Sequence, residues 1–376
     1  MSAANLDPTN PPNSDPTFRN YTSQQAAKYA AHRLSYPSKL YETVIQHHEK
    51  TGGQFNLVLD LGCGPGNATR DIAGYFEEAI GCDAGEAMIG AARELGGKTK
   101  SGKDIVWVVG SGEEFAGLEE VREGTVDLIT VAMAVHWFDM DKFWAQVAKA
   151  LKPGGTVGFS FAPALLVKSR CTLEIHTTNR EQKVANKKYR SRYGHAVVHY
   201  VPSPPPHSLE NPPTNLLQAS YYPHPSVPNR SELLRIFLNF ERNILAPYEL
   251  LPNRLSRDMY DNLPLPWNIP HPIPSSILPP SQFLKLDYDR DGILSNPESD
   301  DFFFGGREVT LKQAEKSLET ASMVTRWREA HPEAVGTEKD VLKMHMEELR
   351  KAMGENESMR TGNSTTIILV KKALET

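Results

Sequence analysis

The chain has 376 residues, 39% of them hydrophobic and 23% charged, which is enough to bury a full core without disulfide or metal staples. Its 41 basic and 46 acidic residues give a formal net charge of −5, which offers no general attraction to nucleic acid or to an anionic membrane, so we expect neither as a partner. Three cysteines are too few for a disulfide framework, and they predict a protein of a reducing compartment, the cytoplasm.

The N-terminal part is predicted to hold a tail and two helices. Residues 1–17 are rich in Pro, Asn, Ser and Asp and lack the apolar core of a signal peptide, so we expect a disordered tail. Thr22 precedes Gln25 by three residues, the spacing of a capping box, which starts a helix that runs to residue 32. Residues 39–50 have apolar positions at helical spacing and form a second predicted helix.

A glycine-rich turn follows the first predicted strand. Residues 58–61 read as a short buried strand with Asp60 inside it, and residues 67–75 read as a helix. Between them, glycines alternate with other residues at Gly62, Gly64 and Gly66. A strand that feeds a glycine turn and a helix is the opening of an α/β nucleotide-binding sheet. The dinucleotide fingerprint G-x-G-x-x-G is excluded, because its third glycine would fall at position 67, which is asparagine.

Four more predicted strands follow, at residues 79–83, 104–109, 126–131 and 156–161. The first of these ends in Asp83, whose two carboxylate oxygens suit the two hydroxyls of a ribose; the alternative is an N-cap for the following helix, residues 86–95. His136 and Trp137 come after the strand at 126–131, at the edge of an open α/β sheet where ligands bind. Asp139 is predicted to cap the next helix.

The glycine turn, Asp83, the turn at residues 110–113, residues 136–139 and residues 152–155 occur in the order and spacing of class I S-adenosylmethionine-dependent methyltransferases, which the sequence resembles. Residues 18–37 and 136–139 resemble the fungal trans-aconitate methyltransferase-like group, and residues 254–267 resemble the substrate-side cap of that group. The resemblance implies a Rossmann-like α/β fold, with a mostly parallel seven-stranded sheet and an α-helical cap inserted after the fifth strand. It also implies S-adenosyl-L-methionine as the cofactor.

Roles for individual residues follow from the same resemblance. Those expected at the cofactor are Asp60, Gly62, Gly64, Gly66, Asp83, Ser111, Gly112, Glu113, Tyr21 and Arg33. Those expected at the substrate are His136, Trp137, Tyr36, Arg254 and Arg257. Two alternatives stay open: Arg33 also fits a solvated cation at a helix end, and residues 110–113 also fit a plain surface turn.

Regular patterns break after the fifth strand. Of the 28 prolines, 18 fall between positions 202 and 280, which excludes long regular elements from much of that interval. Residues 163–222 lie outside the resemblance and are predicted to be an irregular insertion into a methyltransferase domain whose first part is residues 18–162. Residues 223–309 are assigned to a substrate cap. Residues 310–376 are assigned to C-terminal helices and a last strand that completes the sheet.

Within these C-terminal parts we predict three helices and one strand. The helices cover residues 231–245, 310–331 and 341–353, each with an amphipathic pattern. The strand, residues 365–370, is β-branched and suits the antiparallel member of the sheet.

One acidic string matches the calcium-binding EF-hand loop, with Asp287, Asp289, Asp291, Gly292 and Glu298 at the required positions. A calcium site also needs a helix on each side of the loop, and prolines stand before and inside this one. We therefore predict an acidic turn and no metal site.

The sequence predicts S-adenosylmethionine-dependent methyl transfer to a carboxylate of a small molecule. A carboxylate is already ionised at pH 7 and needs no general base. His136 is then expected to position the substrate, and Arg33, Arg254 and Arg257 to hold a polyacid. The alternatives are a hydroxyl or amine acceptor of a secondary metabolite, with His136 as the base, and a cofactor-binding protein without turnover. We expect a monomer or weak dimer.

Overall fold

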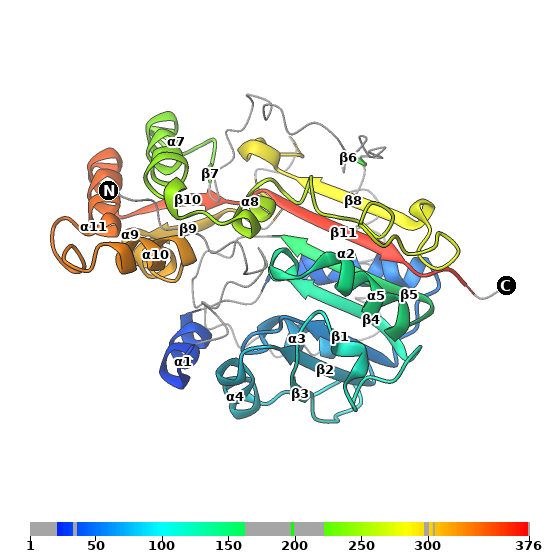
Figure 1. Cartoon of the computed structure of the whole chain (residues 1–376). Coiled ribbons are helices and arrows are strands. Elements are labelled where there is room, and N and C mark those ends of the chain that lie inside the picture. Colours follow the sequence, from blue (N-terminus) through cyan, green and yellow to red (C-terminus); the bar gives the residue numbers. More distant parts are fainter. Residues whose placement is uncertain are drawn as a thin grey trace.

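The computed structural model describes residues 21–32, 36–161, 197–198, 222–296, 301–303 and 305–374. The predicted tail, Arg33 and nearly all of the predicted insertion lie outside these residues. The described part forms a large lobe and a small lobe, each built on its own sheet (Figure 1). No helix in the described ranges is both long and apolar enough to cross a membrane.

The large lobe is built on a sheet of eight strands in the order β3-β2-β1-β4-β5-β11-β8-β6. These strands are β1 (Leu57–Leu61), β2 (Glu78–Asp83), β3 (Val106–Val109), β4 (Val126–Ala132), β5 (Leu151–Phe161), β6 (Val197–Val198), β8 (Phe283–Tyr288) and β11 (Thr365–Lys371). β1 to β5 run parallel, and β11 is antiparallel to both of its neighbours, β5 and β8. This confirms the predicted Rossmann-like, mostly parallel sheet and its antiparallel last strand.

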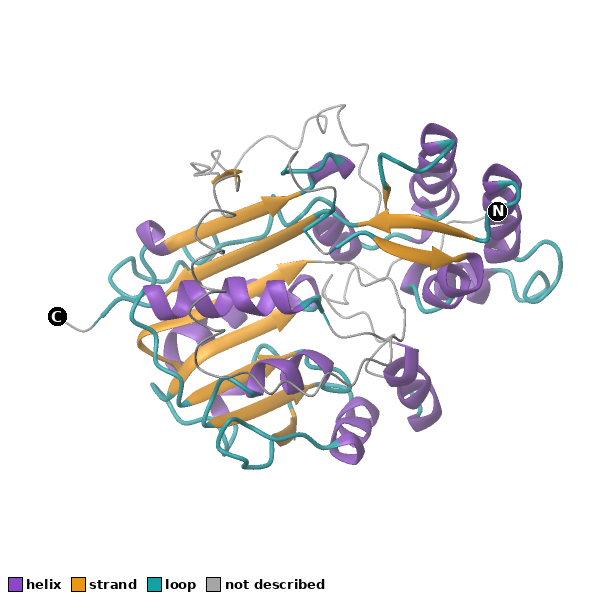
Figure 2. Ribbon diagram, turned by 180° about the vertical axis from the view of Figure 1, so that it is seen from behind, coloured by secondary structure: helices purple, strands orange, loops and turns teal. Residues whose placement is uncertain are grey.

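Helices cover both faces of the large sheet (Figure 2). One face carries α2 (Ser38–Lys50), α3 (Asn67–Ala73) and α4 (Glu86–Leu95), and the other carries α5 (Met140–Ala150). The side chains of β1 alternate between the two faces, and both faces carry apolar residues. Val58 belongs to the apolar core under α2, α3 and α4, whereas Leu59 and Leu61 belong to the core under α5, because successive side chains of a strand point to opposite faces.

The capping box predicted before the first helix is confirmed. The Thr22 backbone N–H donates to Gln25 Oε1 at 2.8 Å, and the Gln25 backbone N–H donates to Thr22 Oγ1 at 3.3 Å. The helix α1 (Ser23–His32) begins directly after Thr22 and packs against α4, near the carboxyl ends of the parallel strands.

The small lobe is built on a sheet in the order β7-β10-β9 and on the helices around it. Its elements are β7 (Tyr222–Pro223), α7 (Arg230–Asn239), α8 (Leu251–Arg257), β9 (Arg307–Thr310), α9 (Leu311–Leu318), α10 (Ser322–Ala330), α11 (Val341–Met353) and β10 (Ser358–Gly362). Apolar residues of α7, α9, α10 and α11 form one core that includes Phe237, Val324 and Leu349. The chain enters this lobe, returns to the large sheet as β8, enters it again and leaves as β11.

The single long helix predicted over residues 310–331 is wrong. The chain forms α9 and α10 instead, separated by a turn around Thr320. The Ser317 backbone oxygen accepts from both the hydroxyl and the backbone N–H of Thr320, at 2.8 and 3.1 Å. The α-helical bond pattern therefore ends here in a tighter turn with i to i−3 hydrogen bonds. This break brings residues 320–323 to the cavity described below.

The sequence analysis did not identify β8, which lies within the residues that it assigned to the cap. The strand carries Lys285 at a buried position, where an apolar residue would have marked the alternation. Lys285 is paired there with Asp261 and, at 3.6 Å, with Asp287. Because a paired lysine occupies a buried position, the alternation of apolar and polar residues that predicts a strand is absent at β8.

The acidic residues that match the EF-hand pattern begin at the end of β8 and make contacts within the protein. Asp287 lies 2.8 Å from Arg290 Nη2 and accepts a hydrogen bond from Thr366 Oγ1 at 2.6 Å. Asp289 accepts from the backbone N–H groups of Ser295 and Phe303. In the part of the chain that the structure describes, no group of three or more His, Cys, Asp or Glu residues is arranged to hold a metal ion. Glu298 lies outside that part.

Candidate functional site

The order in which the chain adds strands to the large sheet reverses between β1 and β4. β1 is followed outward by β2 and β3, while β4 is followed by β5 on the opposite side. In open α/β sheets, the carboxyl ends of the two strands at such a point border a crevice that binds ligands. A cavity of about 300 Å³ lies at this place and is lined by both lobes.

Many of the predicted site residues meet at this cavity. Those that line it are Tyr36, Asp60, Gly62, Gly64, Asp83, Gly112, His136, Trp137 and Arg257. Those described but not lining it are Tyr21, Gly66, Ser111, Glu113 and Arg254. Lining residues that the sequence analysis did not assign to the site include Tyr29, Met88, Met133, Asn253, Ser256 and residues 320–323.

The glycine turn presents its backbone to the cavity at Gly64. This residue has a φ of 54°, and a Cβ there would point into open space, so a ligand can lie directly against the backbone. Gly62 lines the cavity, but a Cβ at this residue would come within 2.4 Å of Ala134 Cβ. Gly66 does not line the cavity, and a Cβ there would come within 2.2 Å of the Trp107 ring. Gly66 is therefore required by packing inside the large lobe.

Asp60 lies in β1 just before the glycine turn and is only 1% exposed. Its carboxylate accepts hydrogen bonds from Thr69 Oγ1 at 2.6 Å and from Thr130 Oγ1 at 2.8 Å. Burial raises the pKa of Asp60 to about 6, against the lowering effect of these two hydrogen bonds. A cation in the cavity would favour the ionised form of this acid.

Asp83 connects two turns at the edge of the cavity. Its Oδ2 accepts a hydrogen bond from the Gly64 backbone N–H at 2.8 Å, and its Oδ1 accepts one from the Gly85 backbone N–H at 2.8 Å. Gly85 is the N-cap residue of α4, so the alternative role of Asp83 as that N-cap is wrong. A carboxylate has about four lone-pair sites, so Asp83 is a residue type that can accept from several donors.

The turn after β3 contributes its backbone to the cavity and uses its side chains elsewhere. Gly112 lines the cavity, and its Cα packs against Phe138 so closely that a Cβ would come within 2.8 Å of the ring. Ser111 Oγ accepts from the Glu113 backbone N–H at 3.2 Å, and Glu113 Oε1 accepts from the Asp139 backbone N–H at 3.1 Å. The predicted cap of α5 is confirmed, since the Asp139 side chain accepts from two backbone N–H groups of its first turn.

His136 reaches the cavity from a short 3₁₀ turn, Val135–Trp137, after β4. Met133 precedes this turn with a φ of 57°, a left-handed conformation that residues other than glycine rarely adopt. The imidazole is 5.0 Å from the Trp137 ring, measured between centroids. Its Nδ1 lies 2.8 Å from the hydroxyl oxygen of Tyr260, which is also buried.

The helix α8 brings the small lobe to the cavity. Asn253, Ser256 and Arg257 line the cavity and occur at i, i+3 and i+4, which puts them on one face of the helix. Arg254 does not line the cavity and pairs with Asp258 at 3.1 Å. Helical spacing in residues 253–257 groups Asn253, Ser256 and Arg257, but it does not separate the two arginines, because Arg254 and Arg257 are also three positions apart.

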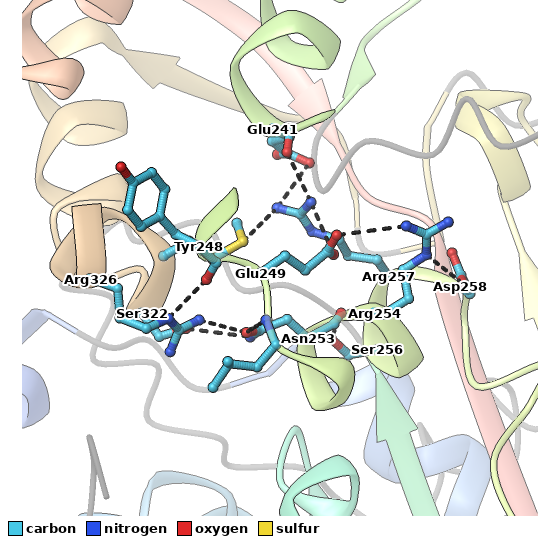
Figure 3. Close-up of polar contacts among 12 residues, drawn as sticks. Glu241, Tyr248, Glu249, Asn253, Arg254, Ser256, Arg257, Asp258, Ser322 and Arg326 are labelled. Atoms are coloured by element: carbon cyan, nitrogen blue, oxygen red, sulfur yellow. Dashed lines mark hydrogen bonds and ion pairs between the residues drawn. The ribbon is translucent and has the colours of Figure 1, made fainter. Parts of the chain in front are cut away.

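Carboxylates surround the guanidinium of Arg257 (Figure 3). Its nitrogens lie 3.3 Å from Glu249 Oε1 and 3.8 Å from Glu241 Oε2, and one donates to the Glu241 backbone oxygen at 3.2 Å. Arg254 lies 3.7 Å from the other carboxylate oxygen of Glu249. Two acids therefore offset the charge of Arg257, and this weakens the expectation that the cavity holds a polyacid.

A second arginine holds the small-lobe wall of the cavity together (Figure 3). Arg326 of α10 donates to Asn253 Oδ1 at 2.7 Å and to the Tyr248 backbone oxygen at 2.8 Å. It also lies within hydrogen-bond distance of Ser322 Oγ, at 3.4 Å. Because Asn253 and Ser322 both line the cavity, Arg326 fixes α8 and the turn before α10 relative to each other.

Tyrosines from the N-terminal segment border the opposite side of the cavity. Tyr29 of α1 and Tyr36 line it. Tyr21 does not, but its ring contacts that of Tyr29 edge-to-face with centroids 6.1 Å apart. Arg33 lies outside the described part of the chain, so its predicted role stays a prediction.

Comparison with known proteins identifies the segment that holds the glycine turn. Residues 59–159 match the methyltransferase domain family. The match runs from β1 to β5, so it includes the glycine turn, Asp83, the turn at Gly112 and His136.

The chain is also similar to several methyltransferases. It is 32% identical over 137 residues to a probable S-adenosylmethionine-dependent methyltransferase of Saccharomyces cerevisiae, covering 36% of this chain and 45% of the yeast protein. It is 31% identical over 150 residues to a methyltransferase of Aspergillus candidus, covering 39% and 45% of the two chains. A solved S-adenosylmethionine-dependent methyltransferase from Clostridium acetobutylicum is 23% identical, with 34% of this chain and 50% of that chain covered and a TM-score of 0.29. The chain spans about half the length of the curated relatives it matches.

Proposed function

We propose that the protein transfers the methyl group of S-adenosyl-L-methionine to a carboxylate of a small molecule bound between the two lobes. One observation carries this proposal: a single cavity has the glycine turn and Asp83 at one end and His136, Asn253 and Arg257 at the other. The methyltransferase domain supplies the first end, and the small lobe supplies much of the second. The two reactants of a methyl transfer would therefore meet in one cavity.

The residues at the glycine turn fit S-adenosyl-L-methionine. Gly64 leaves its backbone open to the cavity, and Asp60 and Asp83 both line it and suit a ligand with a positive charge. When bound, the cofactor supplies a methyl group on a sulfonium sulfur, which departs as a neutral thioether. The protein's own task is to hold the acceptor in line with the sulfur–methyl bond and to exclude water, and such alignment contributes about 7–11 kcal/mol.

The small-lobe wall favours a substrate whose methyl-accepting group can also accept hydrogen bonds. Arg257 and Asn253 carry several N–H donors each on one face of α8, and one of those of Asn253 donates to Ser322 Oγ at 3.3 Å. The Ser256 hydroxyl donates to the Asn253 backbone oxygen at 2.9 Å. A carboxylate accepts such bonds and is ionised at pH 7, so it reacts without losing a proton. Because Glu241 and Glu249 offset the charge of Arg257, the wall suits a monocarboxylate better than a polyacid.

The experiment has two stages with separate outcomes. Calorimetry with S-adenosylhomocysteine tests cofactor binding, and we expect saturable binding with one site per chain. Incubation with S-adenosyl-L-methionine and a panel of monocarboxylic acids, tricarboxylic acids and the matching alcohols and amines then tests turnover. We expect release of S-adenosylhomocysteine together with a methyl ester of a monocarboxylic acid. Methyl ethers or methylamines as the products would contradict the carboxylate acceptor, and binding without any turnover would favour a protein that only binds the cofactor.

A further inference from the structure

His136 and Tyr260 form a buried pair at the edge of the cavity. They are 124 positions apart in the chain, and the distance between His136 Nδ1 and Tyr260 Oη is 2.8 Å. His136 is 5% exposed and Tyr260 is 2% exposed. His136 lines the cavity, whereas Tyr260 does not, so the tyrosine stands behind the histidine.

The backbone around Tyr260 is held in an unusual conformation. Met259 and Tyr260 follow α8 with φ values of 51° and 57°, and each left-handed residue other than glycine costs of order 1 kcal/mol or more. The Tyr260 backbone N–H donates to the Leu255 backbone oxygen at 2.9 Å, which closes the turn onto α8. Such strain persists only where the surroundings require it, and here it aims the Tyr260 hydroxyl at His136.

We propose that Tyr260 is a positioning residue: its hydroxyl donates to Nδ1 of His136, which keeps the imidazole proton on Nε2, where it is donated to the acceptor carboxylate. This inference rests on the proposed function and adds the residue that sets the role of His136. A neutral imidazole carries one proton, so an Nδ1 that accepts a hydrogen bond leaves the proton on Nε2. Nε2 lies on the other side of the ring from Nδ1, and His136 is a wall residue of the cavity.

Burial supports the direction of this hydrogen bond. It raises the pKa of Tyr260 well above its usual value, and the nearby Tyr36 raises it further, so the phenol keeps its proton at neutral pH. A buried tyrosine hydroxyl usually uses its hydrogen in a bond to a neighbouring acceptor. The imidazole Nδ1 is such an acceptor, at hydrogen-bond distance.

The same turn connects His136 to the small-lobe wall. Tyr260 follows directly on α8, whose residues Asn253, Ser256 and Arg257 line the cavity. The turn that holds Tyr260 is therefore continuous with the helix that forms the small-lobe wall. In this arrangement His136 donates a hydrogen bond to the acceptor and removes no proton.

The test compares Tyr260→Phe with a matched control elsewhere in the protein. Tyr248→Phe also removes a tyrosine hydroxyl that faces a histidine Nδ1, that of His331 at 3.4 Å, but neither residue lines the cavity. Nitrogen-15 spectra of histidine-labelled protein distinguish protonated from unprotonated ring nitrogens, and the His136 signals are assigned by their loss in His136→Gln. We expect wild-type His136 to be protonated on Nε2 and unprotonated on Nδ1. Tyr260→Phe should give a mixture of both tautomers, whereas Tyr248→Phe should leave the His136 signals unchanged.

Kinetics give a second readout. Tyr260→Phe should raise KM for the carboxylic acid about three- to tenfold, the effect of one lost hydrogen bond, with S-adenosylhomocysteine affinity unchanged. A wild-type His136 protonated on Nδ1 would overturn the proposal without any variant, and so would a Tyr260→Phe protein with unchanged spectra and KM. If no acid is methylated at all, the proposed function fails, while the wild-type spectrum still decides the role of Tyr260.

Discussion

At the glycine-turn end of the cavity, backbone groups, the buried Asp60 and the half-buried Asp83 form the surface, whereas the small-lobe end is a wall of side chains held by ion pairs. The first end comes from one stretch, residues 60–85, in which Asp83 connects two turns through backbone hydrogen bonds. The second end combines α8 with residues 320–323, and its charges are set by acids at 241 and 249. In the proposed function, cofactor binding thus depends on local backbone geometry, while the choice of substrate depends on side-chain contacts between residues far apart in the chain.

The largest expected effect is on the small-lobe end. Arg257→Met removes the buried cation beside Glu241 and Glu249 and leaves Glu249 with the partly exposed Arg254, so the free energy of unfolding should fall by about 3–5 kcal/mol. Urea denaturation measures this loss. The matched control is Arg254→Met: the Arg254 side chain is 41% exposed, so its loss should reduce the free energy of unfolding by about 1 kcal/mol or less. Equal losses for the two variants would show that buried pairing does not hold this wall.

The next effect concerns the glycine-turn end. Asp83→Ala removes the acceptor of the Gly64 and Gly85 backbone N–H groups and of the expected ribose hydroxyls. Cofactor affinity should fall by about 1.5–3 kcal/mol, the contribution of hydrogen bonds to a charged group. Calorimetry with S-adenosylhomocysteine measures it.

Asp139→Ala is the control for this variant, because Asp139 caps α5 and does not line the cavity. It should destabilise the protein by about 0.5–2 kcal/mol and leave the affinity unchanged. If Asp83→Ala also left the affinity unchanged, the role of Asp83 would be limited to connecting the two turns.

The smallest expected effect is a pH dependence of cofactor affinity, which concerns the glycine-turn end of the cavity and not the small-lobe end. The pKa of Asp60 is raised to about 6, so this acid is ionised at pH 7 and protonated at pH 5. A bound sulfonium cation favours the ionised form, and affinity for S-adenosyl-L-methionine should therefore fall by about tenfold as the pH falls from 7 to 5. S-adenosylhomocysteine, which lacks the positive charge, should show a weaker dependence. Asp60→Asn should remove the difference between the two ligands; a difference that persists in this variant would assign it to another group.

β1 to β5 and β11 of the large sheet could be predicted because each of these strands has a local sequence signal. The glycines, the apolar runs and the β-branched last strand each predict a feature that the structure contains. β8 could not be predicted, because its buried Lys285 depends on acids elsewhere in the chain.

The site divides in the same way. Gly64 and Asp83 follow from the spacing of one segment, and their roles at the cofactor stay predictions. At the small-lobe end, charge pointed to Arg254 as well as Arg257, although only Arg257 lines the cavity. The contribution of Tyr260 depends on a contact across 124 positions, which no local pattern contains.

The most direct test of the account is the rate of methyl ester formation between pH 6 and pH 9, with cofactor and acid both at saturation. Saturating cofactor keeps Asp60 ionised, and carboxylic acids of ordinary pKa, about 4, are ionised throughout this range. The account predicts a nearly constant kcat, because no residue removes a proton. A steep rise in kcat through a pKa of about 7 that is abolished in His136→Ala would contradict it and establish His136 as a general base.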